Sequence, residues 1–232
     1  MTANKTAEDV SRILATEPVD AIISRTRPLT AEMIESCPTL KVISRHGIGY
    51  DIVNLSAATK RGIPVLVTPA TNGQSVAELA IGLMFAAARG ISSHDRLIRE
   101  GKWDRAGQGL QLGGRRLGLV GLGGIGRHVA HIAIACGMKV SACDPMVTSE
   151  SVDSVTMIES LPDLVANSDV LSLHCPLTPQ SRHLIHAQMI AMLPKGALVI
   201  NTARGGLIDE EALAAALTSG PLRGPGLDSH EN

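Results

Sequence analysis

The sequence predicts an α/β protein built on parallel sheets. Short β-rich runs alternate with helical stretches, which is the pattern of parallel βαβ units, and the alternation occurs in two successive parts of the chain. The composition agrees, because 44% of the 232 residues are hydrophobic, only 1% are aromatic, and 23 are glycine. A core of this kind is filled by Ala, Val, Leu and Ile, which suits close packing of helices on sheets.

We expect residues 1–70 to form a first, incomplete domain. Thr6 and Asp9 are spaced as a capping box, which begins a helix that ends near residue 15. Because a parallel α/β domain normally opens with a strand, the first strand and helix of this unit are expected to be missing. The elements that remain alternate as strands 20–24, 41–44 and 64–68 and helices 30–36 and 55–61.

Residues 71–232 are expected to form a second domain, entered through the Pro-Ala-Thr-Asn-Gly segment at 69–73. Helices are predicted at 74–88, 92–99, 125–136, 161–166, 186–192 and 210–219. Strands are predicted at 117–120, 138–143, 170–174, 197–201 and 223–227. Pro225 removes one ladder donor from the last strand. We expect this domain to lack its C-terminal part, including a late strand, which would leave an unpaired edge that invites association.

The charge pattern argues against nucleic acid or a membrane as a partner. Lys and Arg number 21 against 22 Asp and Glu, with no block of like charge. The longest apolar run, at 79–88, is roughly half the length that a bilayer span needs. The polar first ten residues lack the apolar region of a secretory signal, so a cytoplasmic location is expected. The four cysteines show no CxxC spacing, so neither a disulfide framework nor a metal site is predicted.

A glycine motif in the second domain predicts a nucleotide-binding site of the Rossmann type. Gly121-Leu-Gly123-Gly-Ile-Gly126 directly follows an apolar strand and opens a helix. Gly121 allows the tight turn, Gly123 lets the backbone approach a pyrophosphate, and Gly126 lets the helix pack on the strand. The N-terminus of the helix then offers the positive end of its dipole to the phosphates.

Asp144 predicts which dinucleotide is preferred. It lies 18 residues past Gly126, at the carboxyl end of the next strand, where a carboxylate hydrogen-bonds the adenosine ribose. Its charge would repel a 2′-phosphate, and Pro145, Met146 and Val147 follow it rather than Arg or Lys. NAD is therefore predicted over NADP.

Seven motifs in order along the chain resemble the D-isomer-specific 2-hydroxyacid dehydrogenase family, which includes phosphoglycerate dehydrogenases. They are Arg45–Asp51, Gly62–Val65, Ser75–Glu78, Gly101–Trp103, Gly121–Gly126, His174–Thr178 and Asn201–Asp209. The resemblance implies a flavodoxin-like substrate domain beside a Rossmann-type NAD domain, and a homodimer. It also implies hydride transfer between NAD and a small D-2-hydroxy acid or its 2-oxo acid.

The resemblance also implies roles for individual residues. Arg204 matches the catalytic arginine, which clamps the carboxylate and 2-oxygen of the substrate. Gly47 and Ile48 fall in a loop whose backbone N–H groups receive that carboxylate, unless the loop is an ordinary strand-to-helix turn. The positions that match NAD contacts are Gly124, Ile125, Asp144, Cys175, Thr202, Ala203 and Asp228, the last of which meets the carboxamide.

Three arginines leave two readings of the substrate open. Arg25, Arg27 and Arg45 lie at or just beyond predicted strand ends of the first domain, where ligands gather in open α/β sheets. They favour a substrate with a second anionic group, such as a phosphate, sulfonate or carboxylate. The alternative is that they are solvated loop charges.

The proton-handling pair of the family, a His and a Glu, finds no match within residues 1–232. By family spacing the Glu would stand just past Asn232. His230 and Glu231 are poor substitutes because adjacent residues point apart in extended structure, and His46 is only slightly better placed. We therefore expect a truncated, poorly active oxidoreductase. The alternatives are a non-catalytic, corepressor-like NAD-binding interaction module, or a fragment of a longer enzyme with no stable fold of its own.

Overall fold

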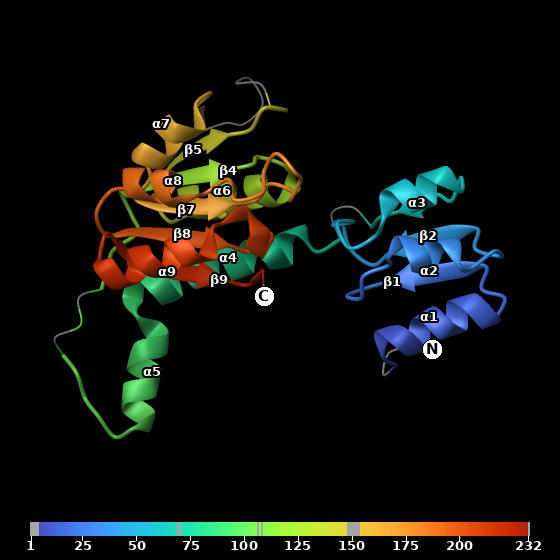
Figure 1. The fold of residues 1–232 in the computed structure, drawn as a ribbon. Coiled ribbons are helices and arrows are strands. Elements are labelled where there is room, and N and C mark those ends of the chain that lie inside the picture. Colours follow the sequence, from blue (N-terminus) through green and yellow to red (C-terminus); the bar gives the residue numbers. More distant parts are fainter. Residues whose placement is uncertain (1–4, 69–70, 106, 108, 148–153, 232) are drawn as a thin grey trace. The chain divides into compact units, whose positions relative to one another are not determined.

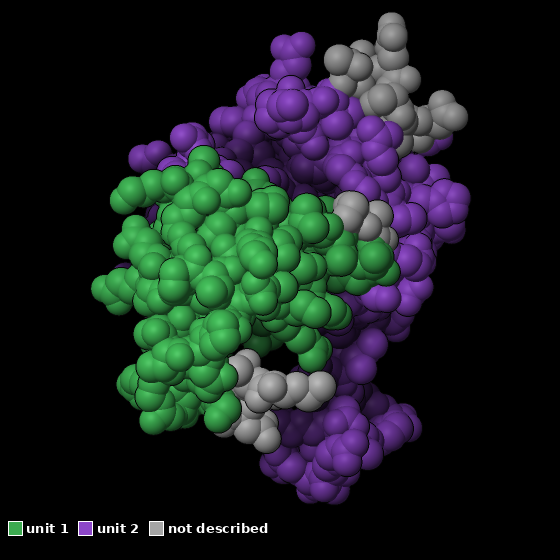
Figure 2. All heavy atoms as spheres, turned by 90° about the vertical axis from the view of Figure 1, so that its right-hand side faces the viewer, with its two compact units in different colours: residues 1–72 green, residues 73–232 purple. Residues whose placement is uncertain are grey.

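The computed structural model describes residues 5–68, 71–105, 107, 109–147 and 154–231. The chain divides into two compact units, Met1–Asn72 and Gly73–Asn232, which are coloured separately in Figure 2. Pro69 and Ala70 of the expected linker lie outside the described residues. We describe each unit by itself.

Unit 1 contains a three-stranded parallel sheet in the order β1-β2-β3. Its elements are α1 (Ala7–Thr16), β1 (Ala21–Ser24), α2 (Ala31–Glu35), β2 (Val42–Arg45), α3 (Leu55–Lys60) and β3 (Val65–Leu66). The capping box forms as predicted, because the Thr6 side chain accepts from the Asp9 N–H while Asp9 accepts from the Thr6 N–H. All three helices contribute to one apolar core around Ile34 and Ile43.

Unit 2 contains a six-stranded parallel sheet in the order β6-β5-β4-β7-β8-β9 (Figure 1). The strands are β4 (Arg116–Val120), β5 (Lys139–Cys143), β6 (Val155–Met157), β7 (Val170–Leu173), β8 (Ala197–Asn201) and β9 (Leu222–Leu227). Numbered along the unit, this order is 3-2-1-4-5-6, which is the doubly wound order of dinucleotide-binding domains. The order reverses beside β4, so the carboxyl end of β4 is the expected ligand position.

The remaining elements of unit 2 are helices. They are α4 (Gly73–Arg89), α5 (Ile91–Arg99), α6 (Gly124–Ala135), α7 (Leu161–Ala166), α8 (Ala187–Met192), the 3-10 turn η2 (Gly205–Leu207) and α9 (Glu210–Ser219). One buried cluster joins α4 and α6 to the sheet and a second joins α7, α8 and α9 to it. Strands β7 and β8 are buried at every residue, as expected for parallel strands that are covered on both faces.

The predicted α/β class with parallel sheets is confirmed. Strand β6 was not predicted, because three residues are too few to establish a period, and the 3-10 turn η2 was not predicted either. The last strand forms with Pro225 inside it, and β9 pairs with β8 at the edge of the sheet. A register shift at Ala197/Leu198 brings Leu198 opposite Gly224 and Val199 opposite Pro225.

Helix α5 differs from the other helices of unit 2 in having no buried residue. It follows α4 at a bend of 64° and extends from the rest of the unit (Figure 1). Among the described residues no single helix is long and apolar enough to cross a membrane. The bent pair of α4 and α5 meets that requirement by length and composition only.

Candidate functional site

The glycine-rich turn lies between the end of β4 and the start of α6. Gly121 has a φ of 98°, and a Cβ there would lie 2.8 Å from the carbonyl carbon and oxygen of His174. A Cβ on Gly126 would press into the carbonyl oxygen of Gly121. A Cβ on Gly123 or Gly124 would meet nothing within 4 Å. Two glycines are therefore required by the protein's own packing, and the other two border open space.

The N-terminus of α6 faces that open space without a side-chain cap. Its N-cap is Gly123, which has no side chain to accept from the first N–H groups of the helix. The helix runs for 12 residues. Its uncapped N–H groups and dipole make this turn suited to an anionic group such as a pyrophosphate.

Asp144, one residue after β5, is tied to the same turn. One carboxylate oxygen accepts from the N–H of Leu122 at 2.7 Å and the other from the N–H of Met146 at 2.8 Å. A carboxylate has about four acceptor positions, so both oxygens retain capacity for ribose hydroxyls. The contact to Leu122 fixes the carboxylate beside the glycine-rich turn.

A cavity of about 1010 Å³ opens at the carboxyl ends of β4, β5 and β7. Its floor includes Gly121 and Gly123, and its walls are mostly apolar, among them Met146, Ile158 and Leu161. Among the described residues that line it are two carboxylates, Asp144 and Glu159, but neither Lys nor Arg. An apolar cleft with a phosphate-binding turn and a carboxylate at one end suits a dinucleotide.

Two further residues that line the cavity are neutral near pH 7. Burial raises the pKa of the Cys175 thiol to about 11, so it is a poor nucleophile and a poor metal ligand. Burial lowers the pKa of His174 to about 4, and its Nε2 lies 2.8 Å from the Ser172 hydroxyl. Within the described part of the chain no group of three His, Cys, Asp or Glu residues is placed to hold a metal ion.

The loop after β8 is held by Asn201, a buried residue. Its Oδ1 accepts from the N–H of Ala203 at 3.0 Å, and its Nδ2 donates to the carbonyl oxygen of Arg204 at 2.8 Å. The hydroxyl oxygen of Thr202 is buried without a hydrogen-bond partner among the described residues. Thr202 directly follows β8, and its contact with NAD stays a prediction.

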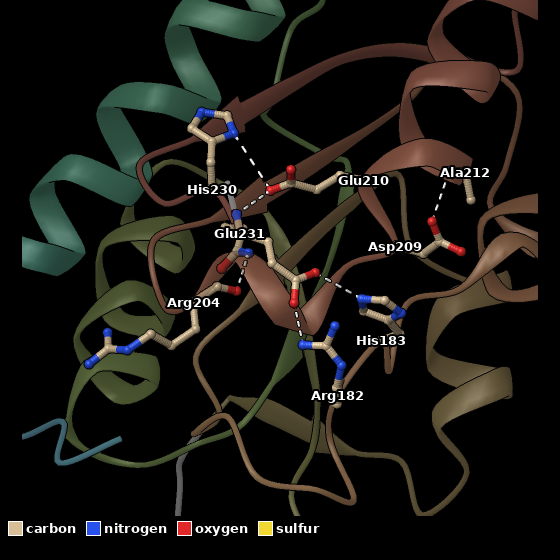
Figure 3. A network of polar contacts seen from close by, with 9 residues as sticks. Arg182, His183, Arg204, Asp209, Glu210, Ala212, His230 and Glu231 are labelled. Atoms are coloured by element: carbon tan, nitrogen blue, oxygen red, sulfur yellow. Dashed lines mark hydrogen bonds and ion pairs between the residues drawn. The ribbon is translucent and has the colours of Figure 1, made fainter. Parts of the chain in front are cut away.

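The segment after β9 is packed against the turn that follows Arg204 (Figure 3). Glu231 binds Arg182 and His183 through its carboxylate, and its N–H donates to Glu210 at 2.8 Å. His230 points instead toward Glu210, with Nδ1 3.6 Å from its carboxylate. The side chains of His230 and Glu231 therefore point apart, whereas Asp228, an exposed residue, follows β9 and donates its N–H to Asn201.

The loop at the carboxyl end of β2 in unit 1 is organised by Arg45. This residue is only 8% exposed, and its guanidinium donates to the carbonyl oxygens of Gly49 at 2.6 Å and Ser24 at 3.0 Å. It also donates to the carbonyl oxygens of Arg25 and His46. Arg45 thus joins the loops after β1 and β2.

The predicted carboxylate-binding residues lie in that loop. Gly47 has a φ of 134° and donates its N–H to the Thr68 hydroxyl at 2.8 Å. Ile48 is half exposed, and no described residue accepts from its N–H or from that of Gly49. Of the two predicted donors, Gly47 thus already donates its N–H within unit 1, whereas that of Ile48 has no acceptor among the described residues.

The sequence of unit 2 decides the family. Residues 81–232 match the family model described as "D-isomer specific 2-hydroxyacid dehydrogenase, NAD binding domain". The chain belongs to the D-isomer specific 2-hydroxyacid dehydrogenase family. The predicted family, its Rossmann-type domain and NAD as the cofactor are thereby confirmed.

Several known proteins are similar to the chain along most of its length. A hydroxypyruvate reductase of Thermotoga maritima is 44% identical over 215 residues, which are 92% of this chain and 70% of that protein. A D-3-phosphoglycerate dehydrogenase of Methanocaldococcus jannaschii is 43% identical over 206 residues, which are 88% of this chain but 39% of that protein. A solved structure of an NAD-dependent formate dehydrogenase of Staphylococcus aureus in complex with NAD is 30% identical to this chain, with a TM-score of 0.91. The match covers 98% of this chain and 69% of that one.

Several contacts that shape the site of this family member were not predicted from the sequence. Asn201 holds the loop of Arg204, and Thr68 accepts from Gly47. Arg182 and Glu231 are 49 residues apart in sequence, so nothing in the local pattern pairs them. Of these residues, only Asn201 could have been predicted from the local sequence, because an Asn that directly follows an apolar strand is well suited to hold a turn through its side chain.

Proposed function

We propose that this chain is part of an oxidoreductase that transfers a hydride between NAD and a D-2-hydroxy acid or its 2-oxo acid. The observation that supports this best is the glycine-rich turn, where packing requires glycine at 121 and 126 beside an uncapped helix and a large apolar cavity. The chain spans 39% of the length of the phosphoglycerate dehydrogenase relative, so we assign this activity to the chain as a proposal.

The chain supplies binding and orientation for this reaction. NAD, when bound, accepts or donates the hydride at its nicotinamide. Thr202, Ala203 and Asp228 are proposed to contact the cofactor, and Arg204 to hold the substrate carboxylate and 2-oxygen. The fork of a guanidinium donates bidentately to a carboxylate, which fixes the orientation of the carbon that reacts.

The function is tested by NADH binding and by its dependence on 2-oxo acids. Fluorescence titration with NADH should show saturable binding. A panel of short 2-oxo acids should drive only slow oxidation of the bound NADH, because residues 1–232 offer no match to the His and Glu that handle the hydroxyl proton in the family. Arg204→Lys should lose most of the 2-oxo-acid dependence while it keeps NADH binding, because a lysine cannot donate bidentately. Failure of the unmodified chain to bind NADH would overturn the proposal. Binding with no response to any 2-oxo acid would favour a non-catalytic NAD-binding module.

We propose that the substrate carries a second anionic group that Arg25 and Arg27 receive. The Arg25 side chain is exposed at the carboxyl end of β1, and one terminal nitrogen of Arg27 is buried without a hydrogen-bond partner in the described structure. Arg45 contributes by holding the loops, since it already donates to four carbonyl oxygens. Arg25→Ala should raise the KM of a dianionic substrate far more than that of a monoanionic one.

We propose a homodimer that forms through α5. Ile98 is 54% exposed, and Trp103, which follows the helix, is 73% exposed. Helix α5 and the residues after it therefore present apolar surface that unit 2 does not cover. Light scattering should give the mass of a dimer for the unmodified chain and of a monomer for Ile98→Glu. Ile23→Glu, at an equally apolar exposed position of β1, serves as the matched control and should remain dimeric.

We also propose a cytoplasmic location. All four cysteines are free thiols, which suits a reducing compartment. Recovery of the protein from an oxidising compartment in cell fractionation would contradict this.

A further inference from the structure

Glu159 and Asp144 lie just past the carboxyl ends of β6 and β5 and line the same cavity. The parallel register of β5 and β6 pairs Val140 with Val155 and Ala142 with Met157. Asp144 and Glu159 each lie two residues past the last of these pairs, Glu159 in a bend beyond the end of β6. The backbones stay in contact there, because the N–H of Ile158 donates to the carbonyl oxygen of Ala142 at 2.8 Å.

Both residues line the cavity of about 1010 Å³, at the end where a ribose would meet Asp144. The Cys143 thiol donates to the carbonyl oxygen of Glu159 at 3.6 Å, which ties the backbone there to the end of β5. The carboxylate of Glu159 has no hydrogen-bond partner among the described residues, whereas both oxygens of Asp144 already accept N–H groups. The negative charge of Glu159 is therefore less stabilised by hydrogen-bond donors than that of Asp144.

The surrounding sequence provides no cation to offset these charges. Between Lys139 and Arg182 the chain contains neither Lys nor Arg. The acidic residues in that interval are Asp144, Glu150, Asp153, Glu159, Asp163 and Asp169. A dianionic phosphate near Asp144 would therefore meet repulsion, and neither this interval of sequence nor the described lining of the cavity offers a guanidinium to offset it.

We propose that Glu159 is a second specificity-determining residue, which acts with Asp144 to exclude dinucleotides that carry a 2′-phosphate. The inference rests on the proposed NAD site. A 2′-phosphate bears nearly two negative charges at neutral pH, so a carboxylate within about 7 Å weakens its binding several-fold at low ionic strength. NAD has hydroxyl groups at the ribose and is spared this repulsion.

The test compares NADH and NADPH binding to the full chain by fluorescence titration. Glu159→Gln should tighten NADPH binding by about 3- to 10-fold and leave NADH binding within about 2-fold. Asp163→Asn is the matched control, because it removes the same charge from the same segment at a residue that does not line the cavity. It should change neither affinity.

Salt provides a second measurement. The gain in NADPH affinity from Glu159→Gln should shrink as ionic strength rises from about 0.01 M to about 1 M, because the Debye length falls from about 30 Å to about 3 Å. A gain that is independent of salt would point to a steric effect and would overturn the inference.

The outcomes separate the two proposals. If the unmodified chain binds no NADH, the proposed function fails and this inference fails with it. If NADH binds and Glu159→Gln leaves the ratio of NADPH to NADH affinity unchanged, or if Asp163→Asn changes it equally, only the role of Glu159 is overturned.

Discussion

Gly126 is the residue of the glycine-rich turn with the least room for a side chain. A Cβ there would press into the carbonyl oxygen of Gly121, so Gly126→Ala must displace either the turn or the start of α6. We expect a loss of about 2 kcal/mol in the free energy of unfolding. We also expect NADH to bind at least about 10-fold more weakly, since the N–H groups that face the phosphates would move. Urea denaturation and NADH titration measure the two effects.

Gly124→Ala is the matched control for this prediction. A Cβ on Gly124 would meet no atom within 4 Å, and the residue is the first of α6. Alanine at a helical position is favoured over glycine, so the free energy of unfolding should stay equal or rise by less than about 1 kcal/mol. An equal loss in both variants would show that the contact with Gly121 is not the cause.

His174 makes stability depend on pH in a defined window. Burial lowers its pKa to about 4 in the folded chain, whereas an unperturbed histidine titrates at about 6.5. Because the unfolded chain binds the proton more tightly, the free energy of unfolding should fall as pH falls from about 6.5 to about 4. We expect a loss of about 2 kcal/mol, allowing for solvent that reaches the ring from the cavity. Urea denaturation at several pH values measures it.

The variant His174→Gln tests the assignment. An amide can still bond the Ser172 hydroxyl but does not titrate, so the fall in stability between about pH 6.5 and pH 4 should flatten. A fall of unchanged size in this variant would assign the pH dependence to another group.

At the scale of elements, Asp169 connects the amino ends of β4 and β7. Its carboxylate accepts from the backbone N–H of Arg116 at 2.9 Å and from the guanidinium of the same residue at 2.9 Å. The hydrogen bond from that side chain is the main cause that lowers the pKa of Asp169. Asp169→Asn should reduce the free energy of unfolding by about 1 kcal/mol at neutral pH, measured by urea denaturation.

The pKa of Asp169 is lowered by its hydrogen bonds to Arg116, whereas that of His174 is lowered by burial. In both cases the free energy of unfolding falls as pH falls. Because the folded carboxyl has the lower pKa, its contribution is present above the ordinary carboxyl range and lost as pH falls through the folded pKa. Asp20→Asn is the control, since Asp20 pairs with Lys41 in an exposed contact that is worth little. An equal loss in the free energy of unfolding of Asp20→Asn would show that the contact of Asp169 with Arg116, which joins β7 to β4, has no special effect.

The elements that the sequence predicted well are those with a long period or a defined motif. Helices α4 and α6 and the turn between β4 and α6 follow directly from apolar spacing and glycine positions. Strand β6 was missed because its three residues show no alternation. The proximity of Asp144 and Glu159 depends on strand order and register, which no local pattern contains. The same holds for the contact of Gly47 with Thr68, 21 residues apart.

At the scale of the whole molecule, the chain consists of two compact units with separate apolar cores. Unit 1 is built around a sheet of three short strands, whereas unit 2 has six strands covered on both faces. We therefore expect each unit to unfold in its own cooperative transition, and unit 1 to be the less stable of the two because its core is smaller.

NADH should therefore stabilise the two units unequally. The residues proposed to contact NAD all lie in unit 2, so NADH at about 100 times its Kd should add about 2.7 kcal/mol to the unfolding of that unit alone. In calorimetry the transition of unit 2 should move to higher temperature. Hydrogen exchange should slow at β4 and α6, and amides in residues 5–68 should exchange as they do without NADH. If NADH slowed amide exchange equally in both units, the two units would unfold as one cooperative body, and NADH binding to unit 2 would stabilise the whole chain.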